Sequence, residues 1–420
     1  MLTRFRAQSF KSLESAELSL PRMLVLFGPN AAGKSNFLEA LQCFSRLATE
    51  RAVEDALAPP LRGYPVEAFR LPPGGLGELM SADKAAFELE GDVLPERRGD
   101  GGTSSRKLRY RVAVETRPSA GSFSVSDEYL APLQMKKDEP FGRPIIEKEG
   151  GTFIVRVRGQ GAHPTHEEPG KNHTIASVPA FTGKHYAYID TLRAELGAWR
   201  SYYLDPRVAM RRACPPSEVT DIGPLGESIA PYLFRLKKEK LNCFAAARRA
   251  LSMIIPSVQD MDVELNRERG EVEITIVQDG VRYPTRVISE GTLRVLALCS
   301  LCVNPWRPAL VAFEEPENGV HPRRLDLIAD MLVSLATEDG TQVVATTHSP
   351  RFCDAILKHQ REMGDSIALV AVTRDGSETR FVPFDPAGPL FHQPDILRGL
   401  TSATEDGVFQ AMMLRGLLDG

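Results

Sequence analysis

Long apolar runs are missing from this sequence of 420 residues. A helix that crosses a membrane needs about 20 predominantly apolar residues in a row. A secretory signal peptide begins with a basic segment before a short apolar one. The first six residues, MLTRFR, lead instead into an amphipathic strand. We therefore expect no membrane segment, no signal peptide, no membrane partner and a cytoplasmic location.

Cysteine is also scarce, with six residues scattered along the chain. Cys299 and Cys302 form a C-x-x-C pair, but they lie in an apolar helical run with no second pair nearby. Because a structural zinc site needs further ligands, this pattern favours core thiols. Four histidines in or near residues 159–183 have a spacing that matches no recognised metal cluster: His163, His166, His173 and His185.

An excess of either charge is lacking too, because the formal net charge is only −4. This balance does not by itself indicate nucleic-acid binding. Two local basic clusters, residues 211–212 and 235–240, are typical of solvated helix faces. They leave open a DNA groove shared by two subunits, since overall charge does not report local potential.

Sustained heptads and internal repeats are absent, so no long coiled-coil arm is expected. Apolar residues make up 42% of the chain and charged residues 25%, which is ordinary for a soluble globular protein. The length predicts roughly two to three domain-sized units.

The most informative feature that is present is the sequence GPNAAGKS at residues 28–35. It follows the apolar run 23–27, which predicts a buried strand, and precedes a helical pattern from Asn36 to Leu41. In that context G-x-x-x-x-G-K-S predicts a phosphate-binding loop, whose backbone N–H groups face phosphate oxygens. Lys34 would reach the β- and γ-phosphates, and the Ser35 hydroxyl would bind Mg²⁺. The alternative is a glycine-rich turn.

Two acidic residues follow a second apolar run. Residues 308–313 predict a buried strand, and Glu314 and Glu315 come directly after it. One carboxylate at such a strand end can bind a metal ion, and the next can deprotonate an attacking water. A solvated acidic turn is the alternative interpretation.

Two further patterns lie nearby in the sequence. Residues 342–347 predict a strand that ends at His348, where an imidazole could reach a γ-phosphate. Ser289 precedes an apolar helix and is a plausible N-cap, with exposed N–H groups that form an anion site. By themselves, a structural histidine and a capped core helix would explain both patterns.

Taken together, the four motifs resemble the ATP-binding-cassette (ABC)-type ATPase head, and most closely the single-chain heads of the SMC/RecF-like group and the OLD-family ATPases. The resemblance rests on GPNAAGKSN, ISEGTLR, LVAFEEPENGVHP and VVATTHSP, in that order, together with an opening strand and turn at residues 5–12. It spans residues 2 to about 350 of the chain.

The resemblance implies a role for each matching residue. Nucleotide binding would involve Gly28, Asn30, Ala31, Ala32, Gly33, Lys34, Ser35 and Asn36. Ser35 and Glu314 would hold Mg²⁺, Glu315 would be the general base, and Lys34 and His348 would stabilise charge. Ser289 and Gly291 would contact the γ-phosphate of ATP held by the other subunit. Glu314 stands where most cassette ATPases have aspartate, which leaves open which glutamate is the base.

The implied fold class is α/β: a P-loop ATPase head with a mixed sheet and flanking helices, an antiparallel β lobe and a helical insertion. We expect the first part of the head at residues 1–186, the insertion at 187–260 and the second part of the head at 261–420. The periodicity predicts strands at 107–114, 152–157, 261–265 and 272–277, helices at 187–200 and 226–255, loops at 92–105 and 159–183, and a tail with a helix at 351–360, a hairpin over 368–382 and a terminal helix.

The implied activity is ATP hydrolysis by a head-to-tail homodimer, or a higher oligomer, closed around ATP and Mg²⁺. The tail of about 70 residues after His348 leaves no room for a Toprim nuclease domain. The resemblance then implies a separately encoded nuclease or effector partner, which could be of Toprim type, in bacterial anti-phage defence. The alternatives are a DNA repair or recombination ATPase that contacts DNA and an ATP-gated scaffold with little turnover. A transporter ATPase is disfavoured because the double glycine of that branch is lacking at residues 289–292.

Overall fold

The computed structural model describes residues 1–95, 106–134, 137–157, 164–168, 170–384 and 409. They form two compact units, which alternate along the chain. The first comprises Met1–Arg22, Gly28–Trp199 and Val370–Pro383. The second comprises Met23–Phe27 and Arg200–Leu369, together with Phe384 and Phe409 among the described tail residues. No helix in the described ranges is long and apolar enough to cross a membrane.

The first unit is built on a broad antiparallel sheet with the strand order β2-β1-β4-β5-β6-β7-β8-β9. Its elements are β1 (Leu2–Phe10), β2 (Leu13–Ser19), α1 (Lys34–Leu47), α2 (Val53–Leu57), α3 (Gly75–Ser81), β4 (Ala85–Val93), β5 (Leu108–Arg117), β6 (Ser122–Pro132), β7 (Ile146–Glu149), β8 (Thr152–Val155), β9 (Thr165–Glu167), α4 (Ala187–Gly197) and β17 (Glu378–Pro383). The strands predicted at 107–114 and 152–157 are confirmed as β5 and β8. Alternate residues of β5 are buried, as one buried sheet face requires.

Helix α1 packs on the buried face of this sheet. Phe37 and Phe44 meet Phe5 of β1 in edge-to-face contacts, with ring centroids 5.6 and 5.5 Å apart. Each such aromatic pair contributes about 0.5–1.5 kcal/mol beyond its area burial. The Phe37 ring also lies 5.3 Å from that of Phe381 on β17. The helix that follows the phosphate loop is therefore fixed on more than one side within this unit.

The second unit contains the strand order β10-β14-β15-β3, in which β14, β15 and β3 run parallel to one another. Its elements are β3 (Met23–Phe27), β10 (Trp199–Tyr202), α5 (Ile229–Glu239), α6 (Leu241–Ile254), β11 (Val258–Asn266), β12 (Glu271–Gln278), β13 (Val281–Pro284), α7 (Glu290–Cys302), β14 (Leu310–Glu314), α8 (Leu325–Thr337), β15 (Gln342–Thr347) and α9 (Pro350–Met363). β10 begins at the last residue of the first unit, and β16 (Ile367–Asp375) begins in the second unit and ends in the first. Every residue of β3 and β15 is buried, because helices cover parallel sheets on both faces.

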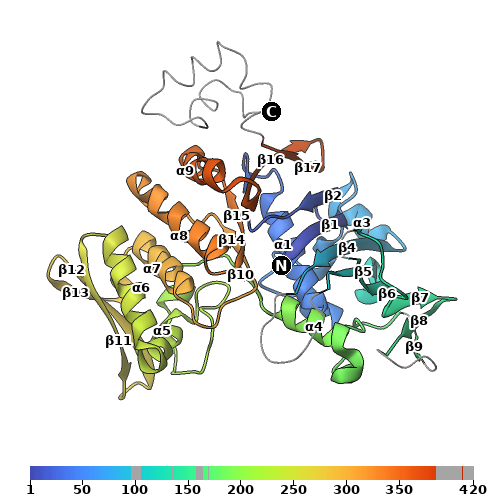
Figure 1. The fold of residues 1–420 in the computed structure, drawn as a ribbon, viewed down its shortest axis with the longest axis horizontal. Helices are drawn as coiled ribbons and strands as arrows, with labels where there is room; N and C mark the ends of the chain where they lie inside the picture. The colour runs from blue at the N-terminus through green and yellow to red at the C-terminus, as the bar shows by residue number, and fades with distance from the viewer. Residues whose placement is uncertain (96–105, 135–136, 158–163, 169, 385–408, 410–420) are drawn as a thin grey trace, which may run out of the picture. The chain divides into compact units, whose positions relative to one another are not determined.

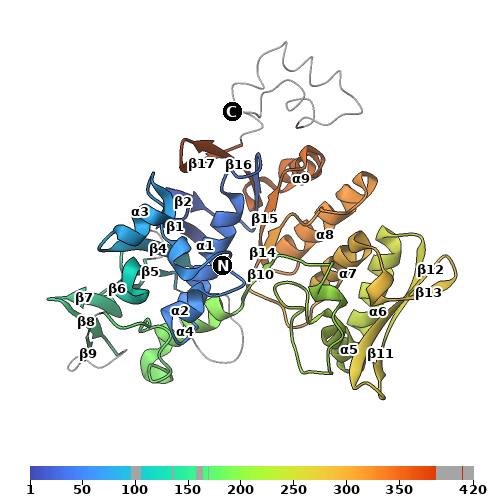
Figure 2. The ribbon, with the colours of Figure 1, turned by 180° about the vertical axis from the view of Figure 1, so that it is seen from behind.

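A separate antiparallel sheet, β11-β12-β13, packs against α5 and α6 (Figures 1 and 2). The hairpin signal at residues 278–280 is confirmed by the pairing of β12 with β13. The helical pattern over 226–255 forms two helices that are separated at Lys240, whose backbone is not helical. Cys299 and Cys302 lie on α7 as free thiols, and burial raises the pKa of both.

Two expectations need correction, and two others fall wholly or mostly outside the described residues. The helix predicted at 187–200 ends at Gly197, and Trp199 and Arg200 belong to β10. The loop predicted at 159–183 contains the short strand β9, which pairs with β8. The tail hairpin is confirmed as β16 and β17. The predicted terminal helix and most of the 92–105 loop fall outside the described ranges.

Candidate functional site

Two glycines of the phosphate loop adopt backbone conformations that other residues rarely take. Gly33 has φ = 107° and is the N-cap of α1, and Gly28 has φ = 148°. Residues other than glycine rarely adopt these φ values. A Cβ on Gly33 would lie 2.0 Å from Thr379 Oγ1, and one on Gly28 would lie 2.2 Å from the carbonyl oxygen of Val372. Both glycines are thus required by conformation and by space.

Lys34 is buried at the start of α1, with 6% of its surface exposed. Its ammonium donates to the carbonyl oxygens of Gly28, at 2.7 Å, and Pro29, at 2.8 Å. The positive charge therefore lies against the main chain of the loop. Ser35 follows in the first helical turn and is half-buried. Gly33, the N-cap of α1, has no side chain and therefore makes no side-chain cap hydrogen bond to the first turn.

The β16–β17 hairpin supports the loop, which the sequence did not predict. Thr379 Oγ1 lies 2.7 Å from Ser12 Oγ, and the Thr379 N–H donates to the Ser12 carbonyl at 3.1 Å. Asn36 Nδ2 donates to the same Ser12 hydroxyl at 2.7 Å. Arg374 reaches the carbonyl of Ala31 at 3.3 Å. Thr379 and Arg374 each bind a residue more than 300 positions away in the sequence, and no local pattern predicts these contacts.

A cluster of ion pairs holds α1 in place through Glu39. Glu39 is fully buried, and its carboxylate accepts from Lys11 Nζ at 2.6 Å and from Arg62 Nε at 2.9 Å. Burial by itself would raise the pKa of Glu39. The hydrogen bonds and charges of Arg62 and Lys11 outweigh that effect, so the pKa of this carboxyl is lowered.

The parallel strands of the second unit end in register at one edge. Glu314 of β14 lies opposite Thr346 of β15, and Thr347 lies opposite Phe27 of β3. Phe27 is the residue immediately before Gly28. The carboxyl ends of neighbouring parallel strands meet at the same sheet edge, where ligands bind in open α/β sheets. The strand ends at Phe27, Glu314 and Thr347 therefore lie at a common edge, and the phosphate loop, Glu315 and His348 follow them in the sequence.

Glu315 and His348 are in direct contact at this edge. His348 Nδ1 lies 2.9 Å from Glu315 Oε1. The backbone of Glu315 has φ = 47°, a left-handed value that is uncommon outside glycine. Its N–H donates to the Thr346 carbonyl at 3.0 Å, which ties the turn to the end of β15. The sequence predicted a separate role for each residue, and the structure shows that their side chains are in contact.

Glu317, the third glutamate of this turn, was not among the predicted site residues. Glu317 is buried and accepts a hydrogen bond from the Thr347 hydroxyl. Asn318 Nδ2 lies 3.4 Å from Glu315 Oε2, and its N–H donates to the Glu315 carbonyl at 3.0 Å. The acidic run EEPEN was the available signal, but only its first two carboxylates were singled out.

Ser289 is the N-cap of α7, as predicted. Its hydroxyl accepts from the Thr292 N–H at 3.1 Å and lies 2.7 Å from the Thr292 hydroxyl. Glu290, the first residue of α7, accepts from Arg207 Nε at 2.9 Å. Arg211 donates to the carbonyls of residues 285, 286 and 288, which fixes the segment that leads into the helix. One member of the 211–212 basic cluster is thus engaged with main-chain oxygens.

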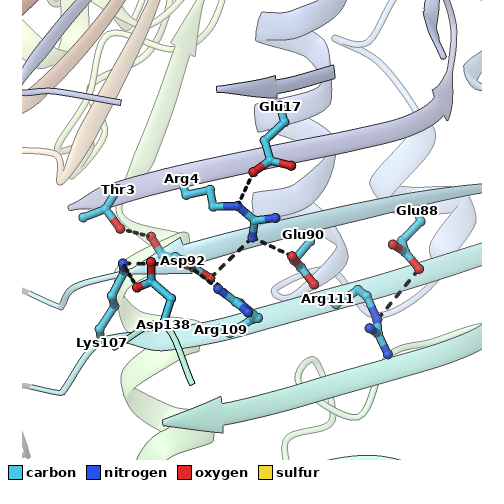
Figure 3. A network of polar contacts seen from close by, with 10 residues as sticks. All are labelled: Thr3, Arg4, Glu17, Glu88, Glu90, Asp92, Lys107, Arg109, Arg111 and Asp138. Carbon is cyan, nitrogen blue, oxygen red and sulfur yellow. Dashed lines mark hydrogen bonds and ion pairs between the residues drawn. The ribbon is translucent and has the colours of Figure 1, made fainter. Parts of the chain in front are cut away.

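A ladder of ion pairs runs across β1, β4 and β5 of the first unit (Figure 3). Asp92 is fully buried, and Arg109 donates two hydrogen bonds of 2.7 and 2.8 Å to its carboxylate. Arg4 bridges Glu17 and Glu90, each at 2.7 Å. The basic side chains of this ladder are thus paired with carboxylates and are not free to bind a phosphate backbone: Arg4, Lys107, Arg109 and Arg111.

No group of three or more His, Cys, Asp or Glu side chains poised to hold a metal was found in the described part of the chain. His163 lies outside the described residues. The predicted Mg²⁺ ligands are of a different kind, one hydroxyl on Ser35 and one carboxylate on Glu314. Mg²⁺ usually takes one or two protein ligands and completes its shell with water and substrate phosphates, which suits such a pair.

Comparison with solved structures shows the fold. An SMC head bound to the C-winged helix domain of ScpA aligns with a TM-score of 0.52 and 13% identity, over 91% of this chain and 98% of that one. An SMC head from Thermotoga maritima covers 91% of this chain and 99% of that one, with 14% identity and a TM-score of 0.41. The first alignment confirms the predicted fold class: the chain has the α/β fold of an SMC-type ATPase head.

Comparison of sequences shows the family. Residues 23–354 match the model described as AAA domain, putative AbiEii toxin, Type IV TA system, and the chain belongs to that family. The lipoprotein-releasing system ATP-binding protein LolD 2 of Rhodospirillum rubrum is 32% identical over 89 residues. That match covers 21% of this chain and 38% of the length of LolD 2.

Proposed function

We propose that this chain binds ATP with Mg²⁺ at residues 28–36 and hydrolyses it. The register of β3, β14 and β15 carries the proposal, because the three strands end at one sheet edge and the phosphate loop, Glu315 and His348 follow them in the sequence. The family is one of P-loop ATPases, which supports nucleotide binding in general. We also propose that residues 187–260 are an insertion between two parts of the head, 1–186 and 261–420.

In the proposed binding step, the loop and α1 receive the phosphates. The N–H groups of residues 28–36 donate to phosphate oxygens, and the N-terminus of α1 favours their negative charge. Lys34 exchanges the carbonyls of Gly28 and Pro29 for the β- and γ-phosphates. Ser35 and Glu314 would hold Mg²⁺, which neutralises charge on the phosphates as a Lewis acid.

In the proposed chemical step, Glu315 is the general base. It accepts a proton from a water that attacks the γ-phosphate in line, which yields ADP and phosphate. The contact with His348 supports this choice over Glu314, because it orients the Glu315 carboxylate at 2.9 Å. His348 and Lys34 stabilise the charge of the transferring group.

We propose that two copies pair head-to-tail, with higher oligomers as the alternative. Each copy would present Ser289 and Gly291 to the γ-phosphate bound by the other. The capped start of α7 supports this role, because a helix N-terminus presents donors to an anion. ATP would then close the pair, and hydrolysis would open it.

The output would be control of a separately encoded effector, which we propose to be a nuclease, of Toprim type or another, in anti-phage defence. The family description, which names a putative toxin, supports a defence or toxin–antitoxin context. The solved SMC head bound to a ScpA domain supports the use of this fold as a docking platform. A scaffold with little turnover differs only in rate and is one outcome of the test below.

The test compares ATP turnover and oligomer mass, with and without ATP, for the wild type, Lys34→Ala and Glu315→Gln. We expect Lys34→Ala to lose nucleotide binding. Glu315→Gln should bind ATP, hydrolyse it about 100- to 1,000-fold more slowly and accumulate as a dimer. Normal turnover by Glu315→Gln would refute its role as base. Tight ATP binding by a wild type that does not turn over would identify the scaffold instead.

A further inference from the structure

Glu317 is a buried carboxyl in the turn that follows β14. Only 6% of its surface is exposed, and no ion pair to it occurs among the described residues. Burial raises the pKa of this carboxyl. One oxygen accepts from the Thr347 hydroxyl, whereas Oε2 is buried without a hydrogen-bond partner in the described structure. Since such a carboxylate is unfavourable for folding, its presence calls for another reason.

Thr347, the hydrogen-bond partner of Glu317, immediately precedes His348 in the sequence. Thr347 is fully buried at the end of β15, and its hydroxyl also accepts from the Ser349 N–H at 2.9 Å. This one hydroxyl therefore fixes the backbone on both sides of His348. Ser349 in turn caps α9 by accepting from the Phe352 N–H at 3.3 Å.

Three hydrogen bonds join the turn after β14 to the end of β15 and the turn that follows it. The Glu315 N–H donates to the Thr346 carbonyl, Glu317 binds Thr347, and Glu315 binds His348. The first two fix the main chain of each turn, and the third lies between the side chains proposed to act on water and phosphate. Loss of the Glu317–Thr347 link would free the His348 turn to move relative to Glu315.

We infer that Glu317 is a positioning residue, which acts through the Thr347 hydroxyl to hold His348 against Glu315. The inference rests on the proposed ATPase function. It assigns Glu317 no contact with nucleotide or metal, and it predicts a defect in turnover that is separate from nucleotide binding and from stability.

Thr347 and Thr346 provide a matched pair of substitutions. Thr347→Val should lower kcat by about 10- to 100-fold, since small misplacements have effects of that size. ATP affinity should change by less than about threefold, because only the chemical step is affected. Thr347→Ser, which keeps the hydroxyl, should restore kcat. Thr346→Val removes a neighbouring buried hydroxyl that has no partner, and it should leave kcat unchanged.

Glu317→Leu separates positioning from structural support. Removal of a buried carboxylate with an unpartnered oxygen should keep or raise Tm, yet kcat should fall as in Thr347→Val. The double variant should be no slower than either single variant, because both remove the same link. Joint loss of Tm, ATP affinity and kcat, or an unchanged kcat in Thr347→Val, would overturn the inference.

A readout without turnover keeps this test independent of the ATPase proposal. The imidazole nitrogen resonances of His348, assigned with His348→Asn in ¹⁵N-histidine-labelled protein, should move in Thr347→Val and stay in place in Thr346→Val. If the wild type hydrolyses no ATP but this pattern holds, the ATPase proposal fails and the positioning stands. Unmoved resonances in Thr347→Val would refute the positioning itself.

Discussion

A methyl group on Gly291 would lie 2.2 Å from the carbonyl oxygen of Gly319. Gly319 itself has φ = 75° and follows the EEPEN turn, so the start of α7 touches the loop that carries Glu315. The resemblance had assigned Gly291 to nucleotide contact. The close approach is a second, local reason for glycine at this position, and it links the Ser289 helix to the acidic turn.

Gly291→Ala should therefore destabilise the protein and slow ATP turnover. The backbone of either α7 or the Gly319 loop must shift, and overpacking of this kind is unfavourable by about 1–3 kcal/mol. Thermal unfolding and kcat measure the two effects. Gly77→Ala is the matched control, because a Cβ there meets nothing within 4 Å on helix α3. That control should stabilise the protein by up to about 1 kcal/mol, and equal behaviour of both variants would contradict the contact.

Thr379→Val should weaken ATP binding although residue 379 lies far from the loop in sequence. The substitution removes the hydroxyl that contacts Ser12 while the side-chain volume is nearly kept. A lost buried hydrogen bond of this kind is unfavourable by about 1 kcal/mol, so ATP affinity should fall several-fold as the loop loosens. Titration calorimetry measures the affinity. Thr337→Val on α8 is the control, since its hydroxyl only bonds the preceding turn at the Val333 carbonyl; an equal loss there would rule out a specific role for Thr379.

Glu39→Gln should destabilise the protein most at neutral pH. The pKa of Glu39 is lowered in the folded state, so its contribution is complete above the unfolded value of about 4.3. It is lost as pH falls through the lower folded pKa. Removal of one member of a buried ion cluster is unfavourable by about 3 kcal/mol.

Denaturant unfolding between pH 7 and pH 3 measures this effect. The difference between wild type and Glu39→Gln should be full at pH 7 and shrink below about pH 4. Glu115→Gln, which breaks the half-exposed pair with Lys84, should change stability by less than about 1 kcal/mol at any pH. A pH-independent difference for Glu39→Gln would show that packing, and not charge, carries its contribution.

The parts of the fold that follow strong local patterns could be predicted from the sequence. The apolar strands β3, β14 and β15, the alternating strand β5 and the Ser289 cap all lie where periodicity and capping rules indicated. The short strand β9 has only three residues, THE, which is too few for any periodicity. Its pairing with β8, and not its own sequence, makes it a strand.

The site could be predicted only as far as strand ends allow. Glu315 and His348 were both predicted because each follows an apolar strand, and parallel strands bring their carboxyl ends together. Their direct contact depends on the left-handed backbone of Glu315, for which no residue pattern existed because glycine is absent there. The contact between Ser12 and Thr379 spans 367 positions, so only the folded chain reveals it.

Phe409 is a buried residue of the tail, and its ring packs against Phe27 at the end of β3. Its ring lies 4.9 Å from that of Phe27 and 4.6 Å from that of Phe384, and its N–H donates to Asp354 at 2.9 Å. Phe409→Ala removes a fully buried ring and should destabilise the protein by about 3–5 kcal/mol. Phe141→Ala, at a half-exposed ring, should change stability by about 0.5 kcal/mol or less. Denaturant unfolding compares the two, and similar stability of both variants would show that the Phe409 ring is not part of the core in solution.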